Sequence, residues 1–199
     1  MKRWIRGLTF GEYEVGMRFR TASRTITEAD VVNFAGLSGD YNAIHTDEEY
    51  AKESPYRHRI AHGMLGAAVS SGLANRLGIF EQTVIALRFQ SMQYKRPIHI
   101  GDTVTMDLLV TRIKGNRHGS RGTVVFETRL VNQHGKTVIE GQWDLLIKGA
   151  ASSESPGGES SEAEASQKER RAAGDTGDSG IVHSGVSVFV EPERDEDDT

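Results

Sequence analysis

The sequence predicts an α+β fold in which a mostly antiparallel, curved β-sheet wraps round one long central helix. Three observations predict it. Residues 63–77 are small or apolar and carry no formal charge until Arg76, which is typical of a buried helix. Residues 83–148 contain four β-branched or alternating segments, separated by short connections that hold glycine. No internal repeat points to another class of fold.

The first helix is expected over residues 28–37. Thr27 can accept a hydrogen bond from an early backbone N–H, and Asp30 adds negative charge near the positive end of the helix. The side chains expected to face the core are Val31, Phe34, Ala35 and Leu37. A Ser-Gly-Asp sequence is expected to end this helix.

Two further helices are expected downstream. Residues 46–49 have the shape of a capping box and begin a short second helix. The third and longest helix covers residues 63–77 and ends before Gly78. Because its residues are small or apolar on every side, we expect it to be buried all round.

The remainder of this region is expected to form strands over residues 83–94, 103–113, 122–132 and 137–148. One face of the second strand carries Val104, Met106, Leu108 and Val110, and one face of the fourth carries Ile139, Trp143, Leu145 and Ile147. Hairpin turns are expected at residues 116–122 and 132–136, and an additional early strand at residues 17–26.

The composition divides the chain into two parts. Residues 1–149 read as one folded domain, with 15 acidic and 20 basic residues. Residues 150–199 hold 13 acidic and 4 basic residues, and residues 150–180 contain none of Val, Ile, Leu, Met, Phe, Trp or Tyr. Such a segment cannot bury enough apolar surface to offset the entropy of ordering it, so we predict a disordered acidic tail with one short apolar island at residues 181–190.

The composition also excludes several classes of function. There is no cysteine, so disulfides, thiolate metal sites and cysteine nucleophiles are excluded. No apolar run approaches the roughly 18 residues of a membrane span, and no signal peptide is visible, so we expect a cytoplasmic protein that does not enter a membrane. No dense run of basic residues with interleaved aromatics suggests nucleic acid.

One loop carries a candidate catalytic pair. Residues 38–47 read SGDYNAIHTD and place Asp40 and His45 between two predicted helices. A carboxylate and an imidazole can hold one water, one of them accepting its proton while the other orients it. Asn42 can hydrogen-bond the loop backbone. On composition alone, a structural role for the pair is the more frequent alternative.

A second stretch, residues 60–73, reads IAHGMLGAAVSSGL. Gly63 stands where the long helix begins, and the first N–H groups of a helix have no partner inside it. Glycine would leave room for a ligand oxygen to approach these N–H groups, which suits a thioester carbonyl gaining negative charge. The alternative is that Gly63 only permits close packing.

Together the two stretches resemble the hydratase motif of the MaoC-like dehydratases, particularly the R-specific enoyl-CoA hydratases. That motif has the form S-G-D-x-N-P-x-H-x-D, followed by I-x-H-G-M-L and S-G-L. The segments here are SGDYNAIHTD, IAHGML and SGL, with Ala43 at the position of the usual proline. The wider resemblance covers about residues 12–148. It implies a single hotdog fold, in which a long helix is wrapped by an antiparallel sheet.

The resemblance also implies roles for individual residues. Asp40 and His45 would activate water, and the backbone N–H of Gly63 would be the oxyanion donor. The residues expected at the substrate are Asn42, His62, Met64 and Ser71. His62 has a competing interpretation as a packing residue or a backbone hydrogen-bonding residue. No metal site is expected, because the remaining histidines lack the spacing of metal ligands.

The expected reaction is hydration of a trans-2-enoyl-CoA to an (R)-3-hydroxyacyl-CoA, or the reverse dehydration. CoA is part of the substrate, and no other cofactor is expected. A single unit implies a homodimer or a dimer of dimers with joined sheets. The alternatives are a dehydratase of acyl-carrier-protein substrates, a hotdog thioesterase and a non-catalytic acyl-CoA-binding regulator.

Overall fold

The computed structural model describes residues 7–150, so the acidic tail and apolar island predicted beyond residue 150 lie outside the described residues. The described part contains a fully antiparallel sheet of six strands in the order β1-β4-β5-β6-β3, with β2 also pairing with β4. The strands are β1 (Arg18–Arg20), β2 (Arg24–Thr25), β3 (Val84–Tyr94), β4 (Thr103–Lys114), β5 (Arg121–Val131) and β6 (Thr137–Lys148). The four predicted long strands are therefore confirmed, and the early segment forms two short strands.

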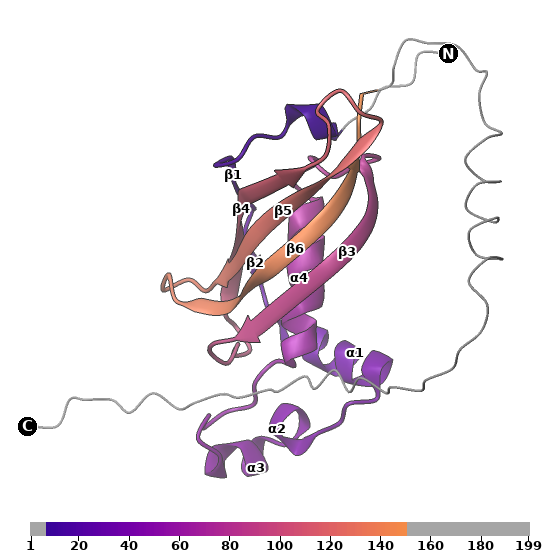
Figure 1. Cartoon of the computed structure of the whole chain (residues 1–199). Helices are drawn as coiled ribbons and strands as arrows, with labels where there is room; N and C mark the ends of the chain where they lie inside the picture. Colours follow the sequence, from indigo (N-terminus) through magenta and orange to yellow (C-terminus); the bar gives the residue numbers. More distant parts are fainter. Residues whose placement is uncertain (1–6, 151–199) are drawn as a thin grey trace, which may run out of the picture. The chain divides into compact units, whose positions relative to one another are not determined.

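The sheet curves round the long helix α4 (Gly63–Asn75), which lies along one of its faces (Figure 1). The helix buries Leu65, Val69 and Leu73 against the sheet. The predicted inner faces of β4 and β6 are confirmed, since all eight of their named side chains are at most 7% exposed. Alternate side chains of a strand point to one face, so the sheet presents a continuous apolar surface to the helix. This is the hotdog arrangement that the sequence resemblance implies.

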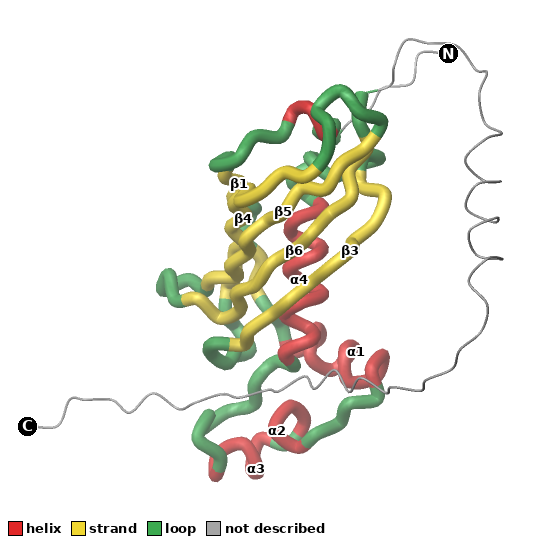
Figure 2. The backbone as a smooth tube through the Cα atoms, in the orientation of Figure 1, coloured by secondary structure: helices red, strands yellow, loops and turns green. Residues whose placement is uncertain are grey.

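Three shorter helices gather beside the beginning of α4 (Figure 2). They are α1 (Glu28–Ser38), α2 (Ala43–Thr46) and α3 (Glu48–Glu53). The predicted cap of α1 is confirmed: Thr27 accepts from the Asp30 N–H, and the Asp30 side chain accepts from the Thr27 N–H. The four-residue helix α2, which carries His45, was not predicted.

Two predictions about burial are wrong. Leu37 is 83% exposed, because at 100° per residue it lies opposite the stripe formed by Val31 and Ala35. The long helix is not buried all round, since one stripe of it at helical spacing is exposed: Met64, Ala68, Ser71 and Asn75. This stripe faces a cavity, described below.

Candidate active site

The loop between α1 and α3 is held in shape by its own short hydrogen bonds. Gly39 ends α1 in the left-handed conformation, with φ of 74°, which glycine adopts without steric cost. The Asp40 carboxylate accepts from the Asn42 N–H at 3.2 Å, and the Asn42 side chain accepts from the Ile44 N–H at 3.2 Å. Asn42 thus caps α2. These bonds fix the backbone on both sides of Ala43, where the motif described above has proline.

His45 is oriented by a backbone carbonyl from another segment. Its Nδ1 lies 2.8 Å from the carbonyl oxygen of Ile60. Because a carbonyl can only accept, Nδ1 must carry the hydrogen, and in the neutral imidazole Nε2 is then the unprotonated nitrogen. His45 is half-buried, so this nitrogen is the one available as a base.

His62 lies beneath this pair and is 2% exposed. Its Nε2–H donates to the carbonyl oxygen of Asp40 at 2.9 Å, and its ring stacks on the His45 ring with 3.9 Å between centroids. The buried Nδ1 of His62 has no hydrogen-bond partner among the described residues. These contacts are those of a residue that supports the loop, and contact between His62 and substrate stays a prediction.

Three chemically active groups come together here. One carboxylate oxygen of Asp40 and one ring nitrogen each of His45 and His62 lie within 4.8 Å of one another. A water bonded at about 2.8 Å to two groups can bridge such a separation. A metal ion would need the two imidazole nitrogens to converge on one point, whereas the rings stack with only 32° between their planes. The absence of a metal at this site stays a prediction, and a bound water is the species that the proposed chemistry uses.

The environment keeps His45 neutral. Burial lowers the pKa of His45 below its ordinary value of 6.5, and the neighbouring His62 acts in the same direction. The hydrogen bond to Ile60 and the charge of Asp40 oppose the shift without cancelling it. A neutral imidazole at physiological pH is the form that can accept a proton from water.

Gly63 is the first residue of α4, so its N–H has no acceptor within the helix. The reason for glycine at this position differs from the expected one. A Cβ added to Gly63 would stand 2.8 Å from Cε1 of Tyr94, so the Tyr94 ring occupies the place that a side chain would take. Close packing against Tyr94 therefore accounts for the lack of a side chain at position 63, and the role of the backbone N–H as oxyanion donor stays a prediction.

A cavity of about 480 Å³ lies between α4 and the inner face of β3 and β6. Its walls include Met64, Ala68 and Ser71 from the exposed stripe of α4, and Phe80 and Trp143 from the core. Ala68 and Ser71 of α4 help to create this space, since their side chains stop at Cβ or Oγ. The cavity is predominantly apolar in its lining, which suits a hydrocarbon chain.

The cavity and the catalytic pair adjoin each other. Neither Asp40 nor His45 lines the cavity, but Phe34 lines it and packs on the His62 ring, with 5.1 Å between centroids. Met64, the residue after Gly63, also lines it. Phe34 thus connects the wall of the cavity to His62, whose ring stacks on His45.

Several site residues were not anticipated from the sequence. The Ile60 carbonyl, the Phe34 ring and the Tyr94 ring each fix a group of the site, and each acts through a tertiary contact. Ile60 belongs to the IAHGML segment, so the motif contained one signal. Nothing local marks Tyr94.

The described helices, within residues 7–150, include none that is long and apolar enough to cross a bilayer.

Comparisons with known proteins show which family this chain resembles. A family model described as "MaoC like domain" matches residues 11–132. An (R)-specific enoyl-CoA hydratase of Rhodospirillum rubrum is 38% identical over 126 residues, which are 63% of this chain and 82% of the relative. A mitochondrial 3-hydroxyacyl-[acyl-carrier-protein] dehydratase of Arabidopsis thaliana is 27% identical over 126 residues, 63% of this chain and 72% of the relative. An unliganded R-hydratase structure from Pseudomonas aeruginosa superposes with a TM-score of 0.62 at 30% identity, covering 78% of this chain and 97% of that one.

Proposed function

The chain belongs to the MaoC-like domain family, and we propose that it is a hydro-lyase that hydrates trans-2-enoyl-CoA to (R)-3-hydroxyacyl-CoA and catalyses the reverse dehydration. The observation that carries this proposal is the meeting of the Asp40 carboxylate and the His45 imidazole within 4.8 Å, beside an apolar cavity and the first turn of α4. The hydratases and dehydratases among its relatives support hydration or dehydration of acyl thioesters as the reaction class.

In the proposed mechanism, a water lies between Asp40 and His45. The thioester oxygen approaches the Gly63 N–H at the positive end of α4, and this interaction strengthens as negative charge develops on the oxygen. The thioester then withdraws electrons from the double bond, so that C3 becomes electrophilic. The water attacks C3 while its proton passes to the Asp40–His45 pair, and a proton is delivered to C2.

No metal or redox cofactor is needed in this scheme, because the attacking water is activated by the two side chains and CoA is part of the substrate. The acyl chain would occupy the cavity along Ser71 and Met64. The R configuration is proposed because two relatives are (R)-specific enoyl-CoA hydratases. A cytoplasmic location stays a prediction of the sequence.

We infer that a second copy of the chain covers β3. This strand ends the sheet, so one of its edges is unpaired among the described strands, and residues 85–91 are exposed without a break. Ile85, Leu87 and Phe89 are 44–51% exposed. A long apolar edge strand left open promotes uncontrolled pairing, whereas antiparallel pairing with its own copy joins two sheets.

The test is a purified-protein assay with crotonyl-CoA that follows loss of the enoyl absorbance. Asp40→Asn and His45→Gln should each lower kcat by about 100-fold or more. His118→Gln, in the exposed turn between β4 and β5, is the matched control and should retain full activity. Unchanged activity in both site variants would remove the mechanism.

Two additional readouts separate the alternatives. Because the chain has no cysteine, a thiol reagent reports only released CoA, and release without hydration would identify a thioesterase. Crotonyl-acyl-carrier protein assayed beside crotonyl-CoA ranks the two carriers by kcat/KM. A regulator would bind crotonyl-CoA without converting it. Chiral analysis of the product checks the R configuration.

A further inference from the structure

Arg59 connects three segments that surround the catalytic loop. Its two terminal nitrogens each donate to one carboxylate oxygen of Glu28 at 2.8 Å. Its Nε donates to Glu48 at 3.1 Å, and Glu48 also accepts from the side chain of His58 at 3.0 Å. The Arg59 side chain is 21% exposed, whereas the side chains of Glu28 and Glu48 are 53% and 39% exposed, so only the arginine is largely shielded from water.

The two glutamates that pair with Arg59 each stand at the beginning of a helix. Glu28 is the first residue of α1, and Glu48 is the first residue of α3. The loop that contains Asp40, together with α2, is the connection between these two helices. A bidentate pair fixes both distance and angle, so Arg59 holds the segment of residues 58–61 in register with both helices.

Ile60, the residue after Arg59, forms hydrogen bonds with α2, the helix that carries His45. The Ile60 N–H donates to the Ile44 carbonyl at 3.3 Å, and the Ile60 carbonyl accepts from His45 Nδ1 at 2.8 Å. Ile60 also forms an isolated bridge with His99, and the Ala61 N–H donates to the Ile98 carbonyl at 2.7 Å. The Ile60 carbonyl belongs to the peptide between Ile60 and Ala61, so a shift of the backbone at Ile60 would change the orientation and the tautomer of His45.

We propose that Arg59 is a positioning residue that, through its pairs with Glu28 and Glu48, holds the Ile60 carbonyl where it fixes His45 as the Nδ1–H tautomer. The catalytic part of this inference rests on the function proposed above. The tautomer part concerns the protein alone and can be measured without substrate.

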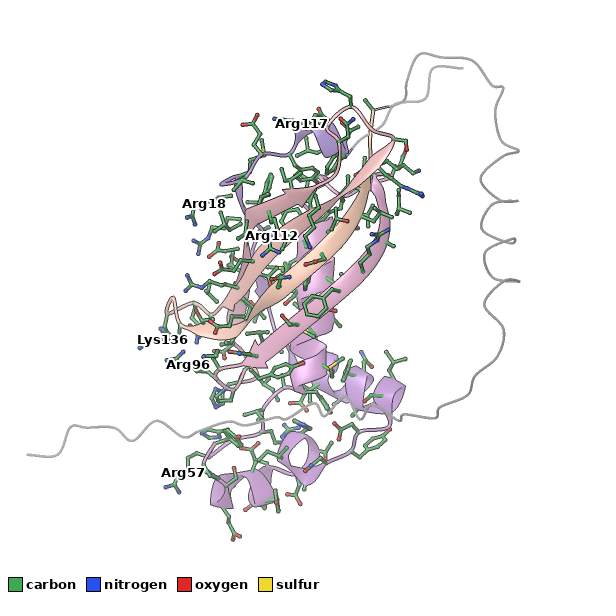
Figure 3. The ribbon with its side chains drawn as sticks, in the orientation of Figure 1. Arg18, Arg57, Arg96, Arg112, Arg117 and Lys136 are labelled. Atoms are coloured by element: carbon green, nitrogen blue, oxygen red, sulfur yellow. The ribbon has the colours of Figure 1, made fainter. Side chains whose placement is uncertain are left out.

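The test compares Arg59→Met and Arg59→Lys with the control Arg57→Met. Arg57 lies two residues away, points away from the helices in Figure 3, and makes no ion pair within residues 7–150. Substitution there changes the net charge equally. Three properties are measured: kcat with crotonyl-CoA, the ¹⁵N chemical shifts of the His45 ring, assigned by their loss in His45→Gln, and the thermal midpoint.

Arg59→Met should lower kcat by about tenfold, because displacement of a catalytic group by a fraction of an ångström carries a cost of this order. KM should change less than twofold, and the His45 ring shifts should move toward a mixture of tautomers. Arg59→Lys, which keeps the charge but loses the bidentate geometry, should fall between wild type and Arg59→Met. Arg57→Met should match wild type.

A folded Arg59→Met protein with unchanged His45 ring shifts would overturn the proposal, whatever its kcat. If Arg59→Met does not fold, Glu28→Gln can replace it, because Glu28 is the more exposed partner of the pair and its substitution weakens the pair without removing Arg59. Unchanged ¹⁵N shifts of the His45 ring in Glu28→Gln would likewise overturn the proposal. A wild-type protein that is inactive on every acyl thioester would refute the proposed function, while the ring shifts would still decide the role of Arg59.

Discussion

The contact between Gly63 and Tyr94 permits a direct test of the helix start as the place where the thioester oxygen binds. In Gly63→Ala, the new Cβ would lie 2.8 Å from Cε1 and 3.0 Å from Cδ1 of the Tyr94 ring. Ordinary contact begins at 3.4 Å, so the ring or the first turn of α4 must move by about 0.6 Å. Tyr94 is anchored by its hydroxyl, which donates to Sδ of Met64 at 3.4 Å.

Both stability and activity should respond. Overpacking of this kind lowers the free energy of unfolding by about 1–3 kcal/mol. If the helix start moves, the Gly63 N–H no longer meets the developing oxyanion, and kcat/KM should fall by about 100-fold, the scale measured for loss of one oxyanion donor. Urea denaturation and the crotonyl-CoA assay measure the two effects.

The double variant Gly63→Ala/Tyr94→Ala identifies the cause. Removing the ring gives the added methyl group a place, so the helix start can return, and kcat/KM of the double variant should exceed that of Gly63→Ala by about tenfold. Tyr94→Ala alone is the reference. Full activity in Gly63→Ala would show that the added methyl group does not displace the helix start from the reacting carbonyl. A double variant no better than Gly63→Ala would show that the ring collision is not the cause.

Three other predictions follow from the same structure. Burial lowers the pKa of His45 below 6.5, and neutral His45 is the proposed base. The value of kcat/KM for hydration should therefore be constant above pH 6.5 and fall as the pH decreases through the lowered pKa. A decrease in kcat/KM with its midpoint above pH 6.5 would contradict this assignment. The same sign applies to stability: the unfolded state binds the proton first as pH falls below 6.5, so the contribution of His45 is present above that pH and is lost on acidification. Ala68→Phe should fill part of the cavity and raise KM for octenoyl-CoA by about tenfold, whereas KM for the shorter crotonyl-CoA should change far less. Equal effects on KM for both substrates would show that the acyl chain binds outside this cavity. Phe89→Asp on the exposed face of β3 should raise the dimer dissociation constant by about 10-fold or more, since burial of a Phe side chain contributes about 1.5–3 kcal/mol. Sedimentation velocity measures this change. An unchanged sedimentation coefficient would exclude this edge of the sheet as the dimer interface.

The secondary structure was largely predictable from the sequence because local patterns produced it. The Thr27–Asp30 cap, the alternation along β4 and β6, and the small residues of α4 each act within a few residues. The short helix α2 was missed, and two further errors concern burial. Leu37 resembles a core residue in sequence, but no element packs against its side of α1 among the described residues.

The candidate site was predictable only in part. The motif identified Asp40, His45 and Gly63 as residue types at fixed spacings, and the fold brings Asp40 and His45 together with the buried ring of His62. The Ile60 carbonyl, the Tyr94 ring and Arg59 were not predictable, because each contributes through a partner at least 11 positions away in the chain.

The sequence by itself determined which chemical groups are present and which segments become helix or strand, because those properties depend on side-chain type and short-range spacing. The tertiary structure alone decided which nitrogen of His45 is unprotonated, why residue 63 must be glycine, and where a hydrocarbon chain fits beside α4. These depend on atoms from distant segments meeting within a few ångströms, and no pattern of neighbouring residues specifies such distances.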